Sequence, residues 1–185
     1  MRDVKNRHRE LPPRTPEMLY NIVRKFYRGA VSHYDLIQEK KQDVRAALAQ
    51  VRASGDDTAL RQALSTLFLE FHFYVTCWLQ IELALFRLAR QDEEQARVLE
   101  RFRPELEKHL HVREQLDQTE ACVQAQQWGN APSGTGAEHS GSEWSCVQED
   151  AYWFAGVRFT VDEQSLQELH ALYEAIQQAR EKQAE

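Results

Sequence analysis

Three histidines, His72, His109 and His111, are the residues of this chain best suited to chemistry. Imidazoles and carboxylates that project inward from neighbouring helices are how helical bundles hold zinc, iron or nickel. Two ligands on one helix normally lie three or four residues apart, and Glu105 with His109 and Glu107 with His111 both match that interval. One hypothesis is therefore a bundle metalloprotein or metal-dependent hydrolase that holds a transition metal ion with His72, His109 and His111.

A second spacing of chemical interest runs from Arg103 to His109, with five residues between them. Over these seven residues it resembles the catalytic motif of the HEPN class of helical ribonucleases, in which the motifs of paired subunits face an RNA phosphate. The resemblance implies that Arg103 would hold charge and that His109 would move a proton. The sequence departs from that class at Pro104, where a polar residue usually follows the arginine. An RNA-directed helical ribonuclease is thus a second alternative.

Other reaction motifs do not occur in the sequence. It contains no Gly-rich phosphate loop, no G-x-S-x-G elbow and no H-E-x-x-H zinc motif. Lys and Arg number 23 against 29 Asp and Glu, and the basic residues concentrate near the N-terminus, so nucleic-acid binding by the acidic body is not expected. The leading expectation is a protein that is not an enzyme and needs no cofactor.

The three cysteines and the N-terminal residues bear on location. Cys77, Cys122 and Cys146 are an odd number with no disulfide or zinc spacing. The first residues, MRDVKNRHRELPP, lack the apolar run of a signal peptide. The sequence therefore predicts a cytoplasmic protein with no membrane association.

The stretch Leu67 to Phe86 is the most apolar part of the chain, with fifteen apolar or aromatic residues among twenty. Glu70 and Glu82 lie within it, and a charge at the depth of a bilayer costs roughly 2.5–3.5 kcal/mol. Such a helix must therefore be surrounded by other helices rather than by lipid. We expect it to be the central helix of a soluble, all-α bundle.

The helix before this central one is long and joined to it by a short break. Thr15 followed by Pro16 is a strong helix start, and an apolar residue recurs every three or four positions to about residue 53. Ser54 to Asp57 ends the first helix and starts the second, which forces the two helices to be antiparallel. Facing positions then pair two buried acids of the second helix with bases of the first, as structural ion pairs: Lys41 with Glu70, and Arg28 with Glu82.

A third long helix should run from Asp92 to about Trp128, with an apolar stripe that includes Leu106 and Leu110 and with a kink or a break at Pro104. Residues 1–14 are then a basic N-terminal arm and 15–128 a three-helix antiparallel core. Residues 129–150, rich in Gly and Ser, form a flexible crossover, and 151–185 complete the bundle with an aromatic segment and a shorter C-terminal helix that begins at the capping box Thr160 to Glu163.

The aromatic segment contains four large rings, and its alternating pattern permits a small β-hairpin before the last helix. Its rings could close one end of the bundle or could bind a partner, because exposed aromatic clusters commonly anchor interfaces. The candidate partner-binding residues are Tyr152, Trp153, Phe154 and Phe159.

The sequence as a whole predicts a non-enzymatic helical bundle that acts through protein–protein contacts, as an adaptor, a regulator or a structural subunit. The second helix is apolar around nearly its whole circumference, more than two neighbouring helices can cover. We therefore expect a protein partner, a second copy of the chain in a homodimer, or both.

Overall fold

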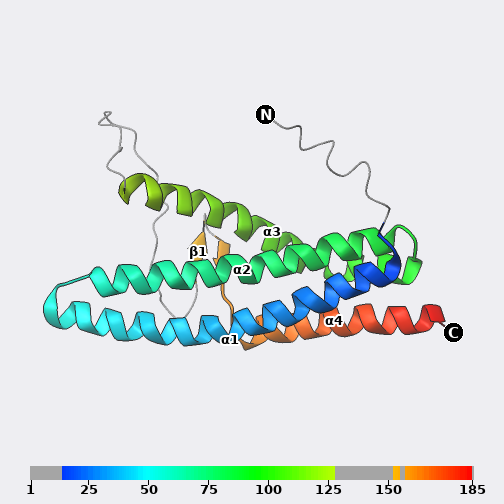
Figure 1. The fold of residues 1–185 in the computed structure, drawn as a ribbon, viewed down its shortest axis with the longest axis horizontal. Coiled ribbons are helices and arrows are strands. Elements are labelled where there is room, and N and C mark those ends of the chain that lie inside the picture. Colours follow the sequence, from blue (N-terminus) through cyan, green and yellow to red (C-terminus); the bar gives the residue numbers. More distant parts are fainter. Residues whose placement is uncertain (1–13, 128–151, 155–156, 185) are drawn as a thin grey trace.

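The protein is an antiparallel bundle of four helices (Figure 1). The structure, a computed structural model, describes residues 14–127, 152–154 and 157–184, with side chains described in 14–113 and 159–182. Three helices are long and the last is shorter, so the predicted all-α bundle is confirmed. Their bounds are α1 (Pro16–Ser54), α2 (Thr58–Ala89), α3 (Glu93–Gln127) and α4 (Glu163–Ala184). Residues 1–13 and 129–150 lie outside the described residues, so the predicted arm and crossover stay predictions.

The first helix begins and ends where local sequence dictates. The backbone N–H of Met18 donates to the Thr15 hydroxyl at 3.3 Å, and Pro16 occupies the first turn, where its missing N–H costs nothing. At the other end Gly55 has a φ of 76° and donates to the carbonyl of Val51 at 2.8 Å. A left-handed backbone of this kind favours glycine, so the turn into α2 is fixed locally.

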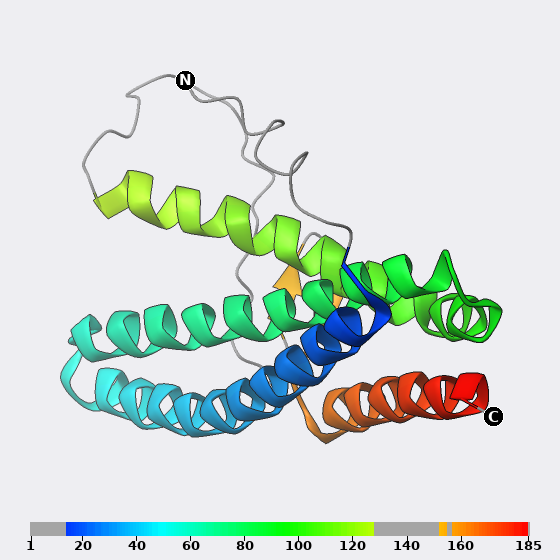
Figure 2. The same cartoon turned by 45° about the vertical axis from the view of Figure 1, so that its right-hand side comes forward.

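The central position of α2 follows from its sequence. Its buried residues alternate at three and four positions, which keeps them on one side of the helix. This buried series is Leu67, Phe71, Tyr74, Trp78, Ile81, Leu85 and Leu88. Helix α2 packs against α1 and α3, and α4 packs against α1 and α3 (Figures 1 and 2).

The third helix is continuous through Pro104, so the predicted break does not occur. Its buried residues also differ from the predicted stripe. Leu106, His109 and Val112 are buried, whereas Leu110 is exposed. The helix is therefore turned by about one residue from the predicted orientation, which brings a histidine rather than a leucine against α2.

Buried polar side chains tie α4 and the residues before it to the long helices. The Lys41 ammonium donates to the carbonyl of Val161 at 2.8 Å, and the Gln38 amide donates to the same oxygen at 2.9 Å. The hydroxyls of Tyr74 and Ser165 are 2.8 Å apart. Tyr27 of α1 stacks on Tyr173 of α4 with ring centroids 3.9 Å apart. These contacts fix where α4 starts and along which side of α1 it runs.

Two three-residue segments precede α4 and are extended and antiparallel, with Tyr152 opposite Phe159. They are β1 (Tyr152–Phe154) and β2 (Val157–Phe159). Residues 155 and 156, between them, lie outside the described residues. The confirmed part of the fold prediction is therefore the helical bundle alone.

Candidate functional site: the outer face of the first helical hairpin

Large apolar side chains are exposed along one face of the hairpin that α1 and α2 form. On α2, Leu69, Phe73 and Leu83 are 52, 45 and 43% exposed. Each follows a buried residue by two positions, which places it about 200° around the helix and hence away from the core. Leu36 of α1 is also exposed. We call the surface formed by Leu36, Leu69, Phe73 and Leu83 the outer face.

The two helices contribute adjoining parts of this face. The ring of His33 on α1 stacks on that of Phe73 on α2, with centroids 5.2 Å apart. Leu36 is three residues after His33, and Leu69 is four residues before Phe73. Because the helices are antiparallel, both steps lead in the same direction by about one turn. Leu36 and Leu69 therefore lie at one level on neighbouring helices.

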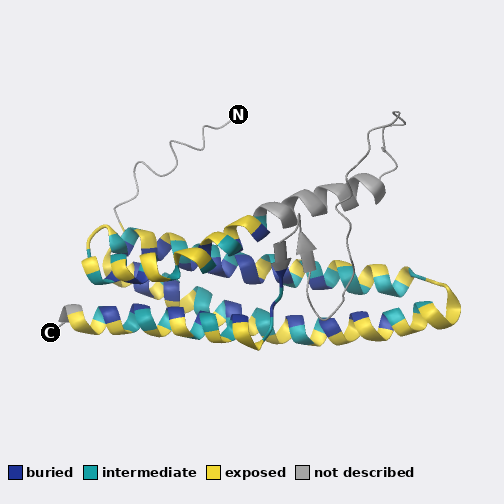
Figure 3. Cartoon of the chain, turned by 180° about the vertical axis from the view of Figure 1, so that it is seen from behind, coloured by how far each residue is buried: buried dark blue, intermediate teal, exposed yellow. Residues whose placement is uncertain are grey.

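The remaining elements lie on the other side of the hairpin. Figure 1 shows β1 behind α2, and Figure 3 shows the molecule from the opposite direction, with α4 beside α1. Contacts of α2 with α3, and of α1 with α4, cover the flanks of the hairpin. Leu36, Leu69 and Phe73 stay exposed on this side, and Arg113 of α3 reaches its edge, where it donates to the Thr76 hydroxyl at 2.9 Å.

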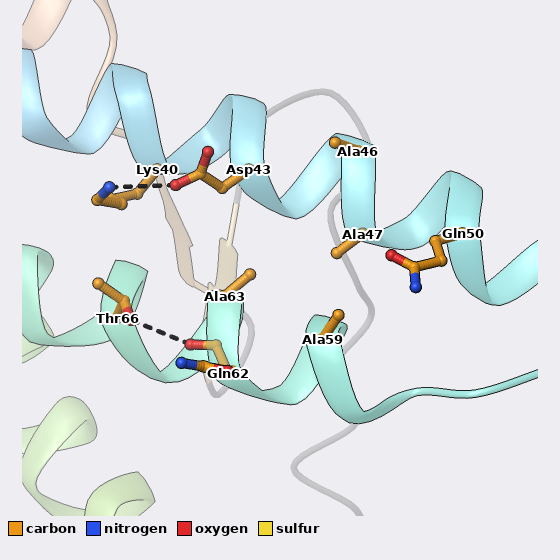
Figure 4. Close-up of a pocket in the computed structure, with 9 residues that line it drawn as sticks. All are labelled: Lys40, Asp43, Ala46, Ala47, Gln50, Ala59, Gln62, Ala63 and Thr66. Carbon is orange, nitrogen blue, oxygen red and sulfur yellow. Dashed lines mark hydrogen bonds and ion pairs between the residues drawn. The ribbon is translucent and has the colours of Figure 1, made fainter.

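A shallow groove of about 410 Å³ lies between α1 and α2 next to the connecting loop (Figure 4). Ala47 of α1 faces Ala59 and Ala63 of α2 across the groove, and the other lining residues are five polar side chains and Ala46. The Lys40 ammonium at this groove is 2.9 Å from Glu39 and 3.1 Å from Asp43, so its charge is balanced locally. The lining residues are Lys40, Asp43, Ala46, Ala47, Gln50, Ala59, Gln62, Ala63 and Thr66.

The groove continues into the exposed apolar residues. Thr66 lines the groove, and Leu69 and Phe73 follow it by one and two turns on the same side of α2. The outer face therefore has a concave part with small side chains and a convex part with large ones. This arrangement suits contact with another helical surface.

The predicted ion pair of Lys41 with Glu70 is wrong. The Glu70 carboxylate is 2.7 Å from Nδ1 of His33, and Lys41 donates to the carbonyl of Val161. The partner of Glu70 on α1 is displaced by eight residues from the predicted one, about two helical turns. The cause is the connection, since residues 55–57 are not helical and lead back along α1, whose end extends beyond the start of α2 (Figure 1).

The second predicted ion pair is also absent from the part of the chain described, because Glu82 lies on a different side of α2. Within the described side chains, no ion pair joins Arg28 to Glu82. The carboxyl of Glu82 has a raised pKa, because burial disfavours its charged form and Glu107 of α3 adds like charge. Glu82 therefore faces α3 rather than α1.

The proposed metal ligands are not brought together. His109 is buried, whereas His111, two residues later and so on the opposite side of α3, is exposed. His72 lies on α2 and is half-buried. Among the side chains that the structure describes, no group of three His, Cys, Asp or Glu residues could share a metal ion.

The Arg103 and His109 pair of the ribonuclease hypothesis is also separated. Arg103 is exposed and forms an ion pair with Glu100 on the same helix. His109 has no exposed surface. A phosphate held by Arg103 at the surface could not reach the imidazole, because the side chain of His109 is enclosed in the core.

His109 is a packed core residue. Its ring stacks on Trp78 with centroids 4.0 Å apart, and Phe159 contacts it edge to face. Nδ1 is 2.8 Å from the carbonyl of Glu105, which assigns the ring proton to Nδ1. Complete burial lowers the pKa of His109 to about 3, so the ring is neutral at pH 7. Neither Nε2 of His109 nor Nε1 of Trp78 has a hydrogen-bond partner in the part of the chain described.

One candidate partner-binding aromatic is a core residue. Phe159 is buried and packs edge to face on Phe71 as well as on His109, so its assignment to a partner surface is wrong. It closes the bundle over the central helix, because residues 159–161 cross the interior before α4 begins. The side chains of Tyr152, Trp153 and Phe154 lie outside those that the structure describes.

None of the described helices has the length and hydropathy needed to cross a bilayer. Comparisons with protein-family models, with curated proteins and with solved structures each find no match. Function must therefore be inferred from the surface and the interior of this chain.

Proposed function

We propose that the protein acts by protein–protein contact and without catalysis, as an adaptor, a regulator or a structural subunit, and that the outer face is its contact surface. The observation that carries the proposal is the exposure of Leu69, Phe73 and Leu83 on a helix that is otherwise the centre of the core. Burial of apolar surface releases roughly 25 cal/mol per Å². A partner that covers these side chains would therefore gain affinity from the apolar surface that it buries.

The rigid backbone of the outer face also supports the proposal. Both helices are held from behind by the core, so little conformational entropy is lost when a partner binds. The charged groups at this face are already paired: Lys40 with Glu39 and Asp43, and Glu70 with His33. Binding would not leave these charges isolated, which is the usual cost of burying ionic groups.

A reducing cytoplasm is the location that we assign, supported by the odd number of cysteines and by the free thiol of Cys77.

The proposal predicts that a double substitution, Leu69→Glu with Phe73→Glu, releases the chain from its assembly. In a cell extract, size-exclusion chromatography should place the wild-type chain at a mass above its own 21.6 kDa. The double variant should elute as a monomer, because two carboxylates in an apolar interface must be desolvated. Both positions are exposed, so the substitutions leave the core intact.

Leu110→Glu is the matched control, since Leu110 is an exposed leucine on α3 with 44% of its surface accessible. It should elute with the wild type. Elution of the double variant with the wild type would contradict the assignment of the outer face.

A further inference from the structure

The convex and concave parts of the outer face match each other in spacing. Leu69 and Phe73 are four residues apart on α2, and so are Ala59 and Ala63, which line the groove. Side chains four residues apart form the ridges of a helix, and such ridges pack into the grooves between small residues of another helix. One chain thus carries a ridge and a groove with the same period, separated by six residues or about 9 Å along α2.

We infer that the outer face binds the outer face of a second copy of this chain, with the two α2 helices antiparallel. Phe73 of each copy then lies opposite Ala59 of the other, and Leu69 lies opposite Ala63. This inference rests on the proposed function and identifies its partner. The symmetry axis passes near Thr66, so both ridges enter both grooves at once and the assembly closes as a dimer.

The first helix adds to the same contact. Because His33 lies beside Phe73, the antiparallel arrangement brings Phe73 and His33 of one copy to the level of Ala46 and Ala59 in the other. The methyl groups of Ala46, Ala47, Ala59 and Ala63 leave the space of about 410 Å³ that the ring and the leucine side chain enter. A partner that offered only a flat surface would leave this groove unfilled.

The overlap is long enough for a specific dimer. It extends along α2 from Thr58 to about Tyr74, roughly 24 Å, and is two helices wide, roughly 20 Å. The projected area is about 500 Å² for each copy, and interdigitated side chains bury more accessible surface than their projection, which reaches the smaller specific interfaces. Lys40 lies near the axis, where its ammonium binds both Glu39 and Asp43, so this cluster carries one net negative charge in each copy.

Sedimentation equilibrium of the purified full-length chain tests the inference. We expect wild-type protein and Leu110→Glu to be dimers at tens of micromolar. Phe73→Glu should be a monomer, with a dissociation constant raised at least about 100-fold, as for the loss of a central interface anchor. Melting temperatures of the three proteins should agree, because every substituted position is exposed.

A size exchange tests the insertion of the ridge into the groove. Ala46→Trp fills the groove from an exposed position and adds no charge, so it should weaken the dimer about 10-fold or more. Adding Phe73→Ala to this variant removes the ring that clashes, and the affinity should recover toward that of the wild type. Ala46→Trp with unchanged affinity, or no recovery in the double variant, would overturn the packing of Phe73 against Ala46 and Ala59.

The outcomes separate this inference from the proposed function. Wild-type protein that stays monomeric when purified, while the larger assembly in extract still depends on Leu69 and Phe73, overturns the second copy as partner and leaves the contact surface in place. A purified dimer that is unaffected by Phe73→Glu places self-association on another surface and overturns this inference; the proposed function is overturned only if the Leu69→Glu, Phe73→Glu variant also elutes with the wild type in extract.

Discussion

Trp78→Ala is expected to lower the free energy of unfolding by about 3–5 kcal/mol, the range for removing a large buried aromatic side chain. Trp78 has no exposed surface, lies at the middle of α2 and stacks on His109. Its removal would leave a cavity between α2 and α3 that rigid neighbours cannot close. Urea unfolding followed by circular dichroism at 222 nm measures the loss.

Trp78→Phe serves as the control. Phenylalanine keeps an aromatic ring against His109 and removes the indole N–H, which has no hydrogen-bond partner among the described residues. We expect a much smaller loss than for alanine, because less volume is removed and an unpaired buried donor is eliminated. Equal losses for the two variants would contradict the assignment of Trp78 to the packed centre of the bundle.

His109 is expected to make the protein less stable as the pH falls. Burial lowers the pKa of His109 to about 3 in the folded state, whereas an unfolded histidine has a pKa near 6.5. Above that value both states are neutral and the full stability is present. As the pH falls from about 6.5 towards 3, only the unfolded state takes up the proton, so this residue should reduce stability by roughly 1.4 kcal/mol per pH unit.

The comparison with His109→Phe isolates this effect. Phenylalanine keeps the stacking on Trp78 but cannot be protonated, so urea unfolding at pH 7, 6, 5 and 4 should show a weaker loss of stability in the variant. The difference between the two proteins is the quantity to measure, because the pKa of Glu105 is raised, mainly by burial, and acts in the opposite direction. Parallel stability curves would show that His109 is accessible to protons in the folded protein.

Features that depend on a few neighbouring residues could be predicted from the sequence. Thr15, Pro16 and Gly55 determine the ends of α1 through local hydrogen bonds and backbone preferences, and they lie where predicted. The central position of α2 could also be predicted, because a helix of such apolar content needs neighbouring helices on most of its sides. The exposed apolar side of α2 was expected for the same reason, because α2 is apolar on more sides than two neighbouring helices can cover.

Features that depend on contacts between helices were not accessible. The predicted partner of Glu70 was displaced along α1, because the path of residues 55–57 is a tertiary property, and His33, eight residues or about two turns before Lys41, takes the place of Lys41. The choice between Leu110 and His109 as the buried residue of α3 likewise depends on how the helix rotates against Trp78. The period of three to four residues between Leu106, His109 and Val112 was the available signal.

The groove was also not predicted, although a signal for it exists. Four alanines line the groove: Ala46, Ala47, Ala59 and Ala63. Alanine is the best helix former, so its presence in a helix normally indicates helix propensity and not a binding surface. Only the pairing of α1 with α2 places the four methyl groups across from one another. Small residues on both sides of a predicted hairpin turn would be the pattern to examine in other sequences.

Oxidative footprinting of Phe73 and Phe86 tests the central claim most directly. The two rings are on the same helix and are 45 and 46% exposed, but only Phe73 lies on the outer face. Mass spectrometry of the purified chain after hydroxyl-radical labelling should show labelling of Phe73 falling as the protein concentration rises into the micromolar range, while that of Phe86 stays constant. Labelling of Phe73 that stays constant, or that falls together with that of Phe86, would contradict the outer face as the contact surface between copies.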